Sequence, residues 1–304
     1  MPFFAVHSPI QTDRVRWEYY RNKAQEQGIA ESAFAIDRTL PVRQRQDNPV
    51  YAGLIETMDI AVGIVLQKLS ELGLDDNTLL IFTSDNGGVS SGDNFSTCNL
   101  PLRGGKGRQW EGGIRVPFFV RTPECYKRGV ACHTPVSGID IYPTVIDYAG
   151  VKPVAGQVMD GVSFRPLIKG GRMAPRPLYW HYPHYGNQGG EPSSIVRDGN
   201  WKLIYYHEDG RYELYNLATD IGEQSDLSRK HPSTVKRLKT MLHRWLKETG
   251  AIMPQKDETY SEKDAEAFRE SCQEILKRQE ELRRDMLHAS WTPNADWWGS
   301  EITD

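Results

Sequence analysis

The sequence has little cysteine, no marked excess of charge of one sign and no long hydrophobic run. Its 304 residues include 37 basic and 40 acidic side chains, for a formal net charge of −3. That near-balance argues against a nucleic acid or an anionic membrane held by bulk electrostatics. No apolar run approaches the roughly 18–20 residues that span a bilayer, so no membrane span is expected. The opening Met1-Pro2-Phe3-Phe4 also lacks the basic and apolar regions of a signal peptide.

The four cysteines include no C-x-x-C pair. Zinc-ribbon spacing is therefore missing, and a structural metal cluster is not expected. Cys125 and Cys132 could close a small disulfide loop in an exported protein, and free or buried thiols are the alternative. The cysteines leave the compartment of this chain unknown.

The order of hydrophobic segments predicts an α/β fold. Apolar residues recur at three- and four-residue steps over 51–72, with Gly73 beyond them, which is typical of an amphipathic helix and its C-cap. Residues 78–83 and 116–120 are continuous apolar runs of strand length, as in strands buried on both faces of a sheet. Helix, strand, loop and strand in this order indicate a large α/β domain.

The amino-terminal segment predicts a core strand. Residues 2–6 are mostly apolar and Pro9 ends the run, which is typical of a short buried strand. A helical stretch is expected around residues 14–27. Because a domain seldom starts on a core strand, we expect this chain to be amino-terminally truncated.

The composition changes near residue 186, where G-N-Q-G-G indicates a loop or linker. Three short alternating segments follow, separated by Asp198-Gly199 and Asp209-Gly210, and predict a small antiparallel sheet with hairpin turns. A packing helix is expected over 232–247. The predicted organisation is therefore a catalytic α/β portion over 1–190, a small sheet subdomain over 191–252 and a charged helical tail over 253–304.

The tail predicts a long charged helix with one apolar seam. Apolar residues step by three and four over 265–286, which suits packing against a partner helix or a groove. The alternative is a helix that lies along its own domain. Trp291, Trp297 and Trp298 are expected to anchor the tail.

Two segments carry candidate chemistry. The strand at 78–83 ends in Ser84-Asp85-Asn86-Gly87-Gly88, whose carboxylate and amide oxygens suit calcium or magnesium better than zinc, although D-N-G-G is also a common turn. Residues 102–107 form a glycine-rich loop that could present Lys106 and backbone N–H groups to a tetrahedral oxyanion. A P-loop is excluded because the G-x-x-x-x-G-K-[ST] spacing is absent. Lys106 could otherwise be a solvated loop charge.

Taken in order, five blocks resemble the formylglycine-dependent, arylsulfatase-like sulfatases. The resemblance spans roughly residues 2–250 and includes late blocks at 197–203 and 213–217. It implies an alkaline-phosphatase-like mixed sheet sandwiched by helices, its amino-terminal part missing, with a small carboxy-terminal antiparallel sheet plus helix. The blocks are H-S-P-I (7–10), T-S-D-N-G-G (83–88), P-L-R-G-G-K-G (101–107), W-E-G-G-I-R-V-P (110–117) and D-I-Y-P-T (140–144).

The resemblance also implies roles for individual residues. Asp85 and Asn86 match two of the four protein ligands of one calcium ion. Lys106 matches the lysine that contacts the sulfate group, and His7 the histidine near the scissile ester oxygen. A cation, an ammonium and an imidazolium would stabilise the charge that develops on the leaving oxygen.

Substrate contacts are less specific. Arg103 is a candidate, with loop stabilisation as its alternative. Residues 179–185 are rich in aromatic rings and include His181 and His184. We expect this segment to form part of a carbohydrate-binding wall, with core packing as the alternative.

The nucleophile of the family is a formylglycine made from cysteine in a C-x-[PA]-x-R context, and no such motif is present. Cys98-Asn99-Leu100-Pro101 is a near miss with its proline one place late. A paired aspartate that completes the calcium site is also missing. We expect these parts upstream of residue 1, in a complete protein that is secreted or periplasmic.

The sequence therefore predicts a sulfuric ester hydrolase that acts on a sulfated small molecule or glycan, with only half the site in this chain and no activity alone. One alternative is a phosphatase or phosphodiesterase of the same superfamily, where a two-zinc site would favour histidine at Asn86. The other is a non-catalytic glycan-binding remnant. The oligomeric state stays open.

Overall fold

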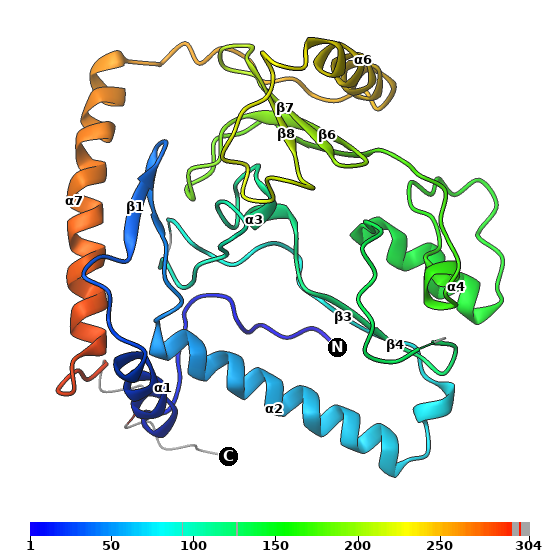
Figure 1. The fold of residues 1–304 in the computed structure, drawn as a ribbon, viewed down its shortest axis with the longest axis horizontal. Coiled ribbons are helices and arrows are strands. Elements are labelled where there is room, and N and C mark those ends of the chain that lie inside the picture. The colour runs from blue at the N-terminus through cyan, green and yellow to red at the C-terminus, as the bar shows by residue number, and fades with distance from the viewer. Residues whose placement is uncertain (93, 126, 294–297, 299–304) are drawn as a thin grey trace.

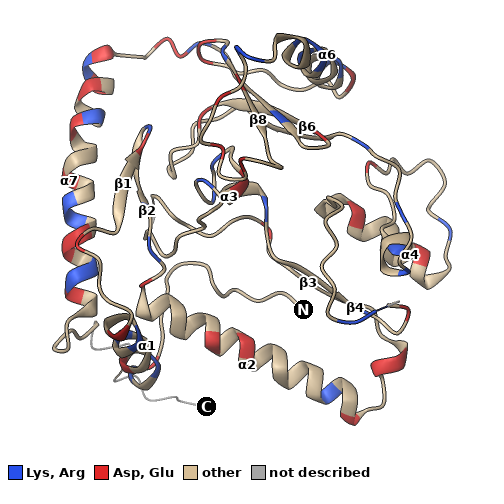
Figure 2. Ribbon diagram, in the orientation of Figure 1, with Lys and Arg blue, Asp and Glu red and all other residues tan. Residues whose placement is uncertain are grey.

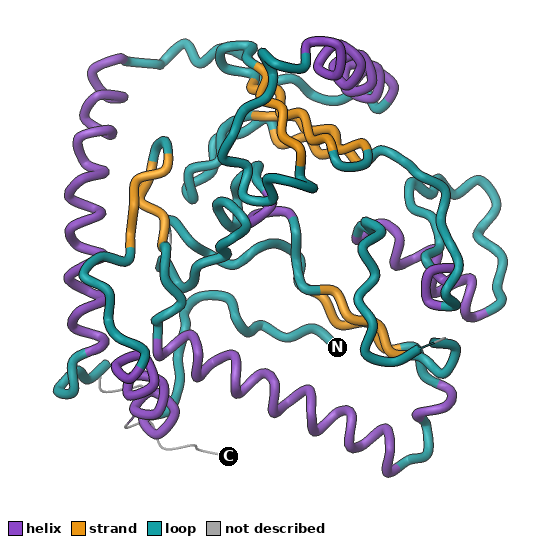
Figure 3. The backbone as a smooth tube through the Cα atoms, in the orientation of Figure 1, coloured by secondary structure: helices purple, strands orange, loops and turns teal. Residues whose placement is uncertain are grey.

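The computed structural model describes residues 1–304 except 93, 126, 294–297 and 299–304. The described residues form three separate antiparallel sheets joined by long loops and bordered by helices (Figures 1 and 3). The helices are α1 (Arg14–Glu26), α2 (Pro49–Glu71), α3 (Glu111–Ile114), α4 (Ile141–Ala149), α5 (Arg165–Ile168), α6 (Pro232–Glu248) and α7 (Glu262–Leu287), with 3₁₀ turns at Asp75–Asn77 and Gly138–Asp140. The strands are β1 (Phe34–Asp37), β2 (Leu40–Arg43), β3 (Leu80–Thr83), β4 (Phe118–Arg121), β5 (Leu178–Tyr182), β6 (Ser193–Asp198), β7 (Trp201–Tyr206) and β8 (Tyr212–Asn216).

Helix α2 confirms the helix expected over 51–72. Asn48 caps its first turn by accepting hydrogen bonds from the backbone N–H groups of Val50 and Tyr51, and Gly73 follows its end in the left-handed region. In the described part of the chain, α2 is long and apolar enough to cross a bilayer, although polar residues interrupt its apolar positions. One such helix is weak evidence of a membrane span, because core helices pass the same test.

The strands β3 and β4 confirm two strands at the expected places, and their burial differs from the prediction. They pair with each other in antiparallel register, Thr83 opposite Phe118, and no further strand lies beside them in the described residues. Both were expected to be buried on two faces, yet β3 is half-buried at best and Phe119 is 62% exposed. Burial on two faces requires covering layers, which the described residues do not supply here.

The segment over 2–6 is not a strand, so that prediction is wrong. It runs in irregular turns, the His7 N–H donates to the Phe4 carbonyl, and Phe4 is 75% exposed. A strand exists only when a neighbouring backbone pairs with it. Apolar composition predicted the strand, but the described chain provides no partner for it.

The long helix α7 lies along the hairpin of β1 and β2, at the left of Figure 1. Glu280 accepts hydrogen bonds from the N–H groups of Ala33 and Phe34, and Arg283 pairs with Asp47 at 2.6 Å. The alternative that this helix lies along its own domain is therefore confirmed.

The end of the chain returns to α1. The ring of Trp17 on α1 contacts Trp291 and Trp298, at centroid distances of 5.5 and 5.3 Å. These contacts agree with the expected anchoring of the tail. The third tryptophan of that prediction, Trp297, lies outside the described residues.

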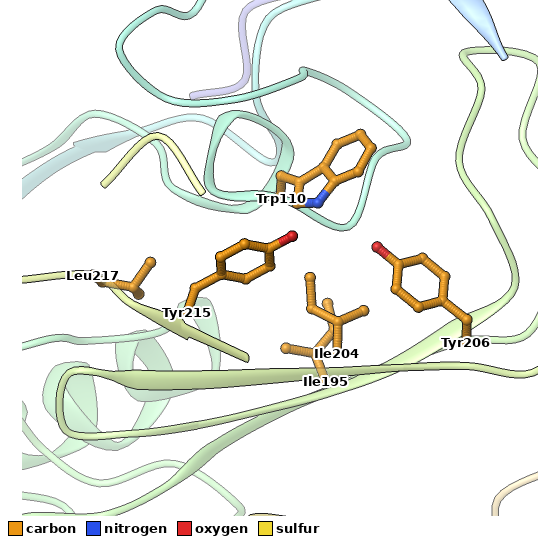
Figure 4. Close-up of a cluster of buried hydrophobic side chains, with 6 residues drawn as sticks. All are labelled: Trp110, Ile195, Ile204, Tyr206, Tyr215 and Leu217. Carbon is orange, nitrogen blue, oxygen red and sulfur yellow. The ribbon is translucent and has the colours of Figure 1, made fainter. Parts of the chain in front are cut away.

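The carboxy-terminal sheet confirms the predicted hairpins and adds a strand. Its order is β5-β6-β7-β8, all antiparallel. The added strand, β5, precedes residue 191, so the sheet begins earlier in the chain than its hairpins. One face of the sheet packs against α6 through Leu238 and Leu242. The opposite face packs against Trp110, which enters from a central loop (Figure 4).

The loop over 186–190 is packed rather than a free linker. Gln188, Gly189 and Gly190 are buried, and a Cβ on Gly190 would lie 1.9 Å from the Gly107 carbonyl oxygen. The loop therefore packs directly against the loop that carries Lys106.

All four cysteines, including Cys125 and Cys132, are free thiols.

Candidate functional site

The loop after β3 carries Asp85 and Asn86 at the surface. The Asp85 carboxylate accepts a hydrogen bond from the Asn86 N–H at 3.0 Å, and the Ser84 hydroxyl donates to the Asn86 carbonyl at 2.9 Å. The Gly87 N–H donates to the Gly113 carbonyl at 3.0 Å, so this loop is bonded to the last glycine of the W-E-G-G segment. Local bonds thus fix the backbone at Asn86 and one oxygen of the Asp85 carboxylate.

A single side chain joins this loop to the lysine loop. The amide of Asn99 accepts from the Gly88 N–H at 3.2 Å and donates to the carbonyls of Gly88 and Gly104, at 2.9 and 3.0 Å. The Lys106 N–H donates to the same Gly88 carbonyl at 3.0 Å. Sequence reasoning missed Asn99, which was considered only within the near miss of the formylglycine motif. Its position between two glycine-rich segments was the available signal.

The structure brings His7 and Lys106 into direct contact. The Lys106 Nζ lies 2.8 Å from the His7 Nε2, and the His7 Nδ1 lies 2.9 Å from the Ser8 carbonyl oxygen. A carbonyl only accepts, so these partners assign the ring proton to Nδ1 and leave Nε2 to accept from the ammonium. Two candidates that are 99 positions apart therefore form one pair, and His7 is exposed.

Arg103, a candidate substrate contact, is already engaged within the protein. Its guanidinium makes two bonds to the Asp37 carboxylate at 2.7 and 2.9 Å, donates to the Glu223 carbonyl at 3.0 Å and lies 3.7 Å from the Trp110 ring centroid. Burial by itself would raise the pKa of Asp37, but the ion pair with Arg103 lowers it below its usual value. These contacts favour the loop-stabilising alternative for Arg103.

A buried cluster of Lys202, Glu223 and Glu111 lies at the start of α3, next to these loops. The Lys202 Nζ lies 2.7 Å from Glu223 and 3.1 Å from Glu111, and all three residues are at most 2% exposed. The second carboxylate oxygen of Glu223 accepts from the Glu111 N–H at 2.6 Å, where α3 begins. Burial raises the pKa of Glu223, and Lys202 opposes that change. The cluster anchors the W-E-G-G segment to the carboxy-terminal sheet, and sequence reasoning did not find it.

The histidines of the predicted carbohydrate wall have different surroundings. Both ring nitrogens of His181 on β5 are bonded, one to the Ser194 hydroxyl at 2.7 Å and one to the Ile252 carbonyl at 2.8 Å. His184 is exposed, with its ring 5.4 Å from Tyr182. Tyr179 stacks on Trp245 of α6 at 4.9 Å, as the core-packing alternative predicts. The wall stays a prediction, and His184 is the exposed one of its two histidines.

The donor set for a cation is partial in this chain. Asp85 and Asn86 offer one carboxylate and one amide oxygen, both hard ligands at an exposed loop. Within the described ranges, no three His, Cys, Asp or Glu side chains gather to hold an ion. The residues fit one side of a calcium or magnesium site.

Comparisons with known proteins agree with this arrangement. The family model described as "Sulfatase" matches residues 1–151, and one described as "N-sulphoglucosamine sulphohydrolase, C-terminal" matches residues 106–251. A sulfatase of Formosa agariphila is 34% identical over 226 residues, which cover 67% of this chain and 39% of the relative.

Solved structures show the same fold. The crystal structure of Ps i-CgsB in complex with k-i-k-neocarrahexaose is 25% identical with a TM-score of 0.64, over 93% of this chain and 54% of that one. The phosphonate monoester hydrolase of Silicibacter pomeroyi is 25% identical with a TM-score of 0.51, over 66% of this chain and 40% of that one.

The chain spans between about a quarter and two-fifths of the length of the first curated relatives it matches. Its fold is the alkaline-phosphatase-like α/β fold of those neighbours. The ordered blocks, the paired His7 and Lys106, and the two family models identify one family. This chain belongs to the formylglycine-dependent, arylsulfatase-like sulfatases.

Proposed function

We propose that this chain supplies the cation-binding and sulfate-contacting half of an enzyme that hydrolyses sulfate esters of carbohydrates. The observation that carries the proposal is the 2.8 Å contact between Lys106 and His7, beside the loop of Asp85 and Asn86. Hydrogen bonds through Gly88 and Asn99 hold the two loops together. His7 and Asp85 are exposed and Lys106 and Asn86 are half-buried, so a substrate can reach the group.

We assign the cation as calcium, held in part by Asp85 and Asn86. A bound calcium ion supplies positive charge that stabilises the oxygens of a sulfate group. The neutral amide of Asn86 supports calcium over zinc, because an amide oxygen is a hard ligand. Among the described residues no group of three or more His, Cys, Asp or Glu side chains gathers, so Asp85 and Asn86 form only part of the ligand set.

Lys106 and His7 then have separable roles. The ammonium of Lys106 binds and orients a sulfate oxygen, in place of its contact with the His7 Nε2. The bond between the Nδ1–H of His7 and the Ser8 carbonyl orients the ring. Once Lys106 turns to the sulfate group, Nε2 takes up a proton and gives it to the leaving ester oxygen. A positioned proton donor contributes on the order of 10²–10⁴ in rate.

A carbohydrate substrate is supported by two relatives. One matching family model is named for an N-sulphoglucosamine sulphohydrolase, and Ps i-CgsB was solved in complex with k-i-k-neocarrahexaose. Within this chain, the exposed His184 is the substrate-contacting candidate that we retain. His181 and Arg103 would have to release internal partners first.

A second candidate function is hydrolysis of a phosphate or phosphonate ester, favoured by the shared fold of the Silicibacter pomeroyi hydrolase. The two functions differ in the metal they use. We expect calcium with a sulfate ester, whereas a two-zinc site would accompany phosphate chemistry.

The test measures release of inorganic sulfate from a sulfated oligosaccharide and from an aryl sulfate. The native gene product that contains these residues should release sulfate in the presence of calcium, and Lys106→Ala should abolish that release. The 304 residues alone should show none, because they contain no C-x-[PA]-x-R motif. Calcium-dependent turnover by the 304-residue chain would contradict the half-site. Two bound zinc ions with phosphonate hydrolysis would establish the alternative.

A further inference from the structure

Positive charge is concentrated on one segment around α6. Residues 229–247 contain seven lysines and arginines, two histidines and no acidic residue. The rest of the chain then holds 30 basic and 40 acidic side chains. Basic residues are therefore concentrated in this segment beyond what the composition of the chain alone would give, and Figure 2 shows blue along α6. The seven are Arg229, Lys230, Lys236, Arg237, Lys239, Arg244 and Lys247.

These side chains face solvent and are mostly unpaired. All seven are exposed, while Leu238, Leu242 and Leu246 on the other face of α6 are buried in the core beneath the sheet. Of the seven, Arg237 alone makes an ion pair within the described residues, with Asp198. The other six leave their charge available to an anion from outside.

The geometry of the segment is a groove with spaced cations. The residues that line a shallow surface groove of about 680 Å³ include Ser228, Lys236, Lys239, Thr240 and His243. At about 1.5 Å of rise per residue, Lys236 and Lys247 are separated by about 16 Å along the helix axis. Such a row suits an extended chain with repeated negative groups better than one small anion.

The groove also has groups that suit a sugar. The Lys239 ammonium lies 4.7 Å from the Tyr212 ring centroid, and the Tyr212 hydroxyl bonds to the His243 Nε2 at 2.7 Å. Burial, and then the nearby Lys239, lower the pKa of His243, so this ring acts as a neutral hydrogen-bonding group. Hydroxyl and imidazole groups between cations can meet the hydroxyls between sulfate groups.

We propose that the basic face of α6 is a second binding site for a sulfated polysaccharide, separate from the His7–Lys106 site. The choice of a sulfated sugar among polyanions rests on the proposed function. A membrane surface fits less well, because Val235, Met241 and Trp245 of α6 are half-buried and the large exposed apolar side chains lie on other elements.

The position of α6 explains what such a site would do. It packs on the face of the β5–β8 sheet opposite to Trp110, whose loop leads to the candidate site. A polymer held on α6 would raise the effective concentration of its sulfate esters at the distant site without occupying it. The site therefore favours long chains over single sulfated sugars.

The test compares binding of four probes to the 304-residue chain: dextran sulfate, uncharged dextran, duplex DNA and phosphatidylserine vesicles. The triple variant Lys236→Gln/Lys239→Gln/Lys247→Gln should bind dextran sulfate about tenfold more weakly and with a shallower salt dependence. The matched control, Lys263→Gln/Lys277→Gln/Arg278→Gln on exposed positions of α7, should bind as the wild type does.

Equal affinity of the α6 variant and the wild type would overturn the proposal. So would equal binding of uncharged dextran, or lysine-dependent binding of DNA or vesicles as tight as that of dextran sulfate. The variant His7→Ala/Lys106→Ala should keep the affinity for dextran sulfate, because the polymer is held on α6. A failure of the proposed function at His7 and Lys106 can therefore be told apart from a failure of the α6 site. Loss of affinity in that variant would place the polymer at the other site and refute the inference.

Discussion

Replacing Lys202 by methionine tests the buried cluster that supports the candidate site. The ammonium is fully buried between Glu223 and Glu111, at 2.7 and 3.1 Å. Methionine has a similar length and leaves both carboxylates without this partner. Removing one member of a buried ion pair costs about 3–5 kcal/mol, because an uncompensated charge stays out of water.

In the Lys202→Met variant, the carboxylates of Glu111 and Glu223 differ in the partners that remain to them. Glu111 retains Arg197 at 3.5 Å and Arg115 at 3.9 Å. Glu223 retains the Glu111 N–H and no second cation among the described residues. Most of the cost should therefore come from Glu223, and adding Glu223→Gln to Lys202→Met should recover part of the lost stability.

The pH dependence follows from the raised pKa of Glu223. A carboxyl whose folded pKa is above its unfolded value binds more protons in the folded state, so its contribution to stability falls as the pH rises through the folded pKa. Without Lys202 this pKa should rise further. The loss in the Lys202→Met variant should thus be smaller at pH 5 than at pH 8.

The assay is chemical and thermal unfolding followed by circular dichroism. At about 2–4 °C per kcal/mol for domains of 150–250 residues, the melting temperature should fall by roughly 10 °C. Lys263→Met, at an exposed position of α7, is the control and should change stability by less than about 0.5 kcal/mol. A Lys202→Met variant as stable as the wild type, or a loss that does not depend on pH, would refute the reasoning.

Three further predictions concern the loops around the site. Asn99→Ala removes three hydrogen bonds and should lower the free energy of unfolding by about 1–3 kcal/mol while weakening calcium binding, both measurable by titration. Gly105→Ala places a Cβ 2.4 Å from the Gly88 carbonyl oxygen and should cost about 1–3 kcal/mol, whereas Gly138→Ala meets nothing within 4 Å and serves as its control. Arg103→Ala removes the cation that lowers the pKa of Asp37. A carboxyl with a lowered folded pKa stabilises the fold at pH values above its unfolded pKa, and this stabilisation is lost as the pH falls through the folded pKa. The stabilities of the variant and the wild type should therefore differ most at neutral pH and converge in acid unfolding curves.

Local patterns explain which elements could be predicted. The three- and four-residue periodicity found α2 and α6, and the Asp-Gly turns found the hairpins of the carboxy-terminal sheet, because those signals lie within each segment. The hairpin of β1 and β2 was missed, since its four-residue strands are short and one contains Pro41. The prediction of a strand over 2–6 was wrong, because apolar residues alone do not provide a neighbouring strand with which to pair.

The candidate site also has features that the sequence predicts and features that it does not. The types of Asp85, Asn86 and Lys106 could be read from their glycine-rich loops, but the contact of Lys106 with His7 joins positions 99 residues apart. The supporting pair of Lys202 and Glu223 could not be predicted from the sequence, because a buried ion pair uses the same residue types as charged side chains on the solvated surface. Tertiary geometry alone distinguishes the two.

The most direct test of the central claim is a calorimetric titration of inorganic sulfate into the 304-residue chain, with and without calcium. The account predicts tighter sulfate binding with calcium, loss of the calcium effect in Asp85→Ala and loss of sulfate binding in Lys106→Ala. Asp76→Ala, at another exposed carboxylate, should behave as the wild type does. Sulfate binding that is indifferent to calcium and unchanged by Lys106→Ala would contradict it.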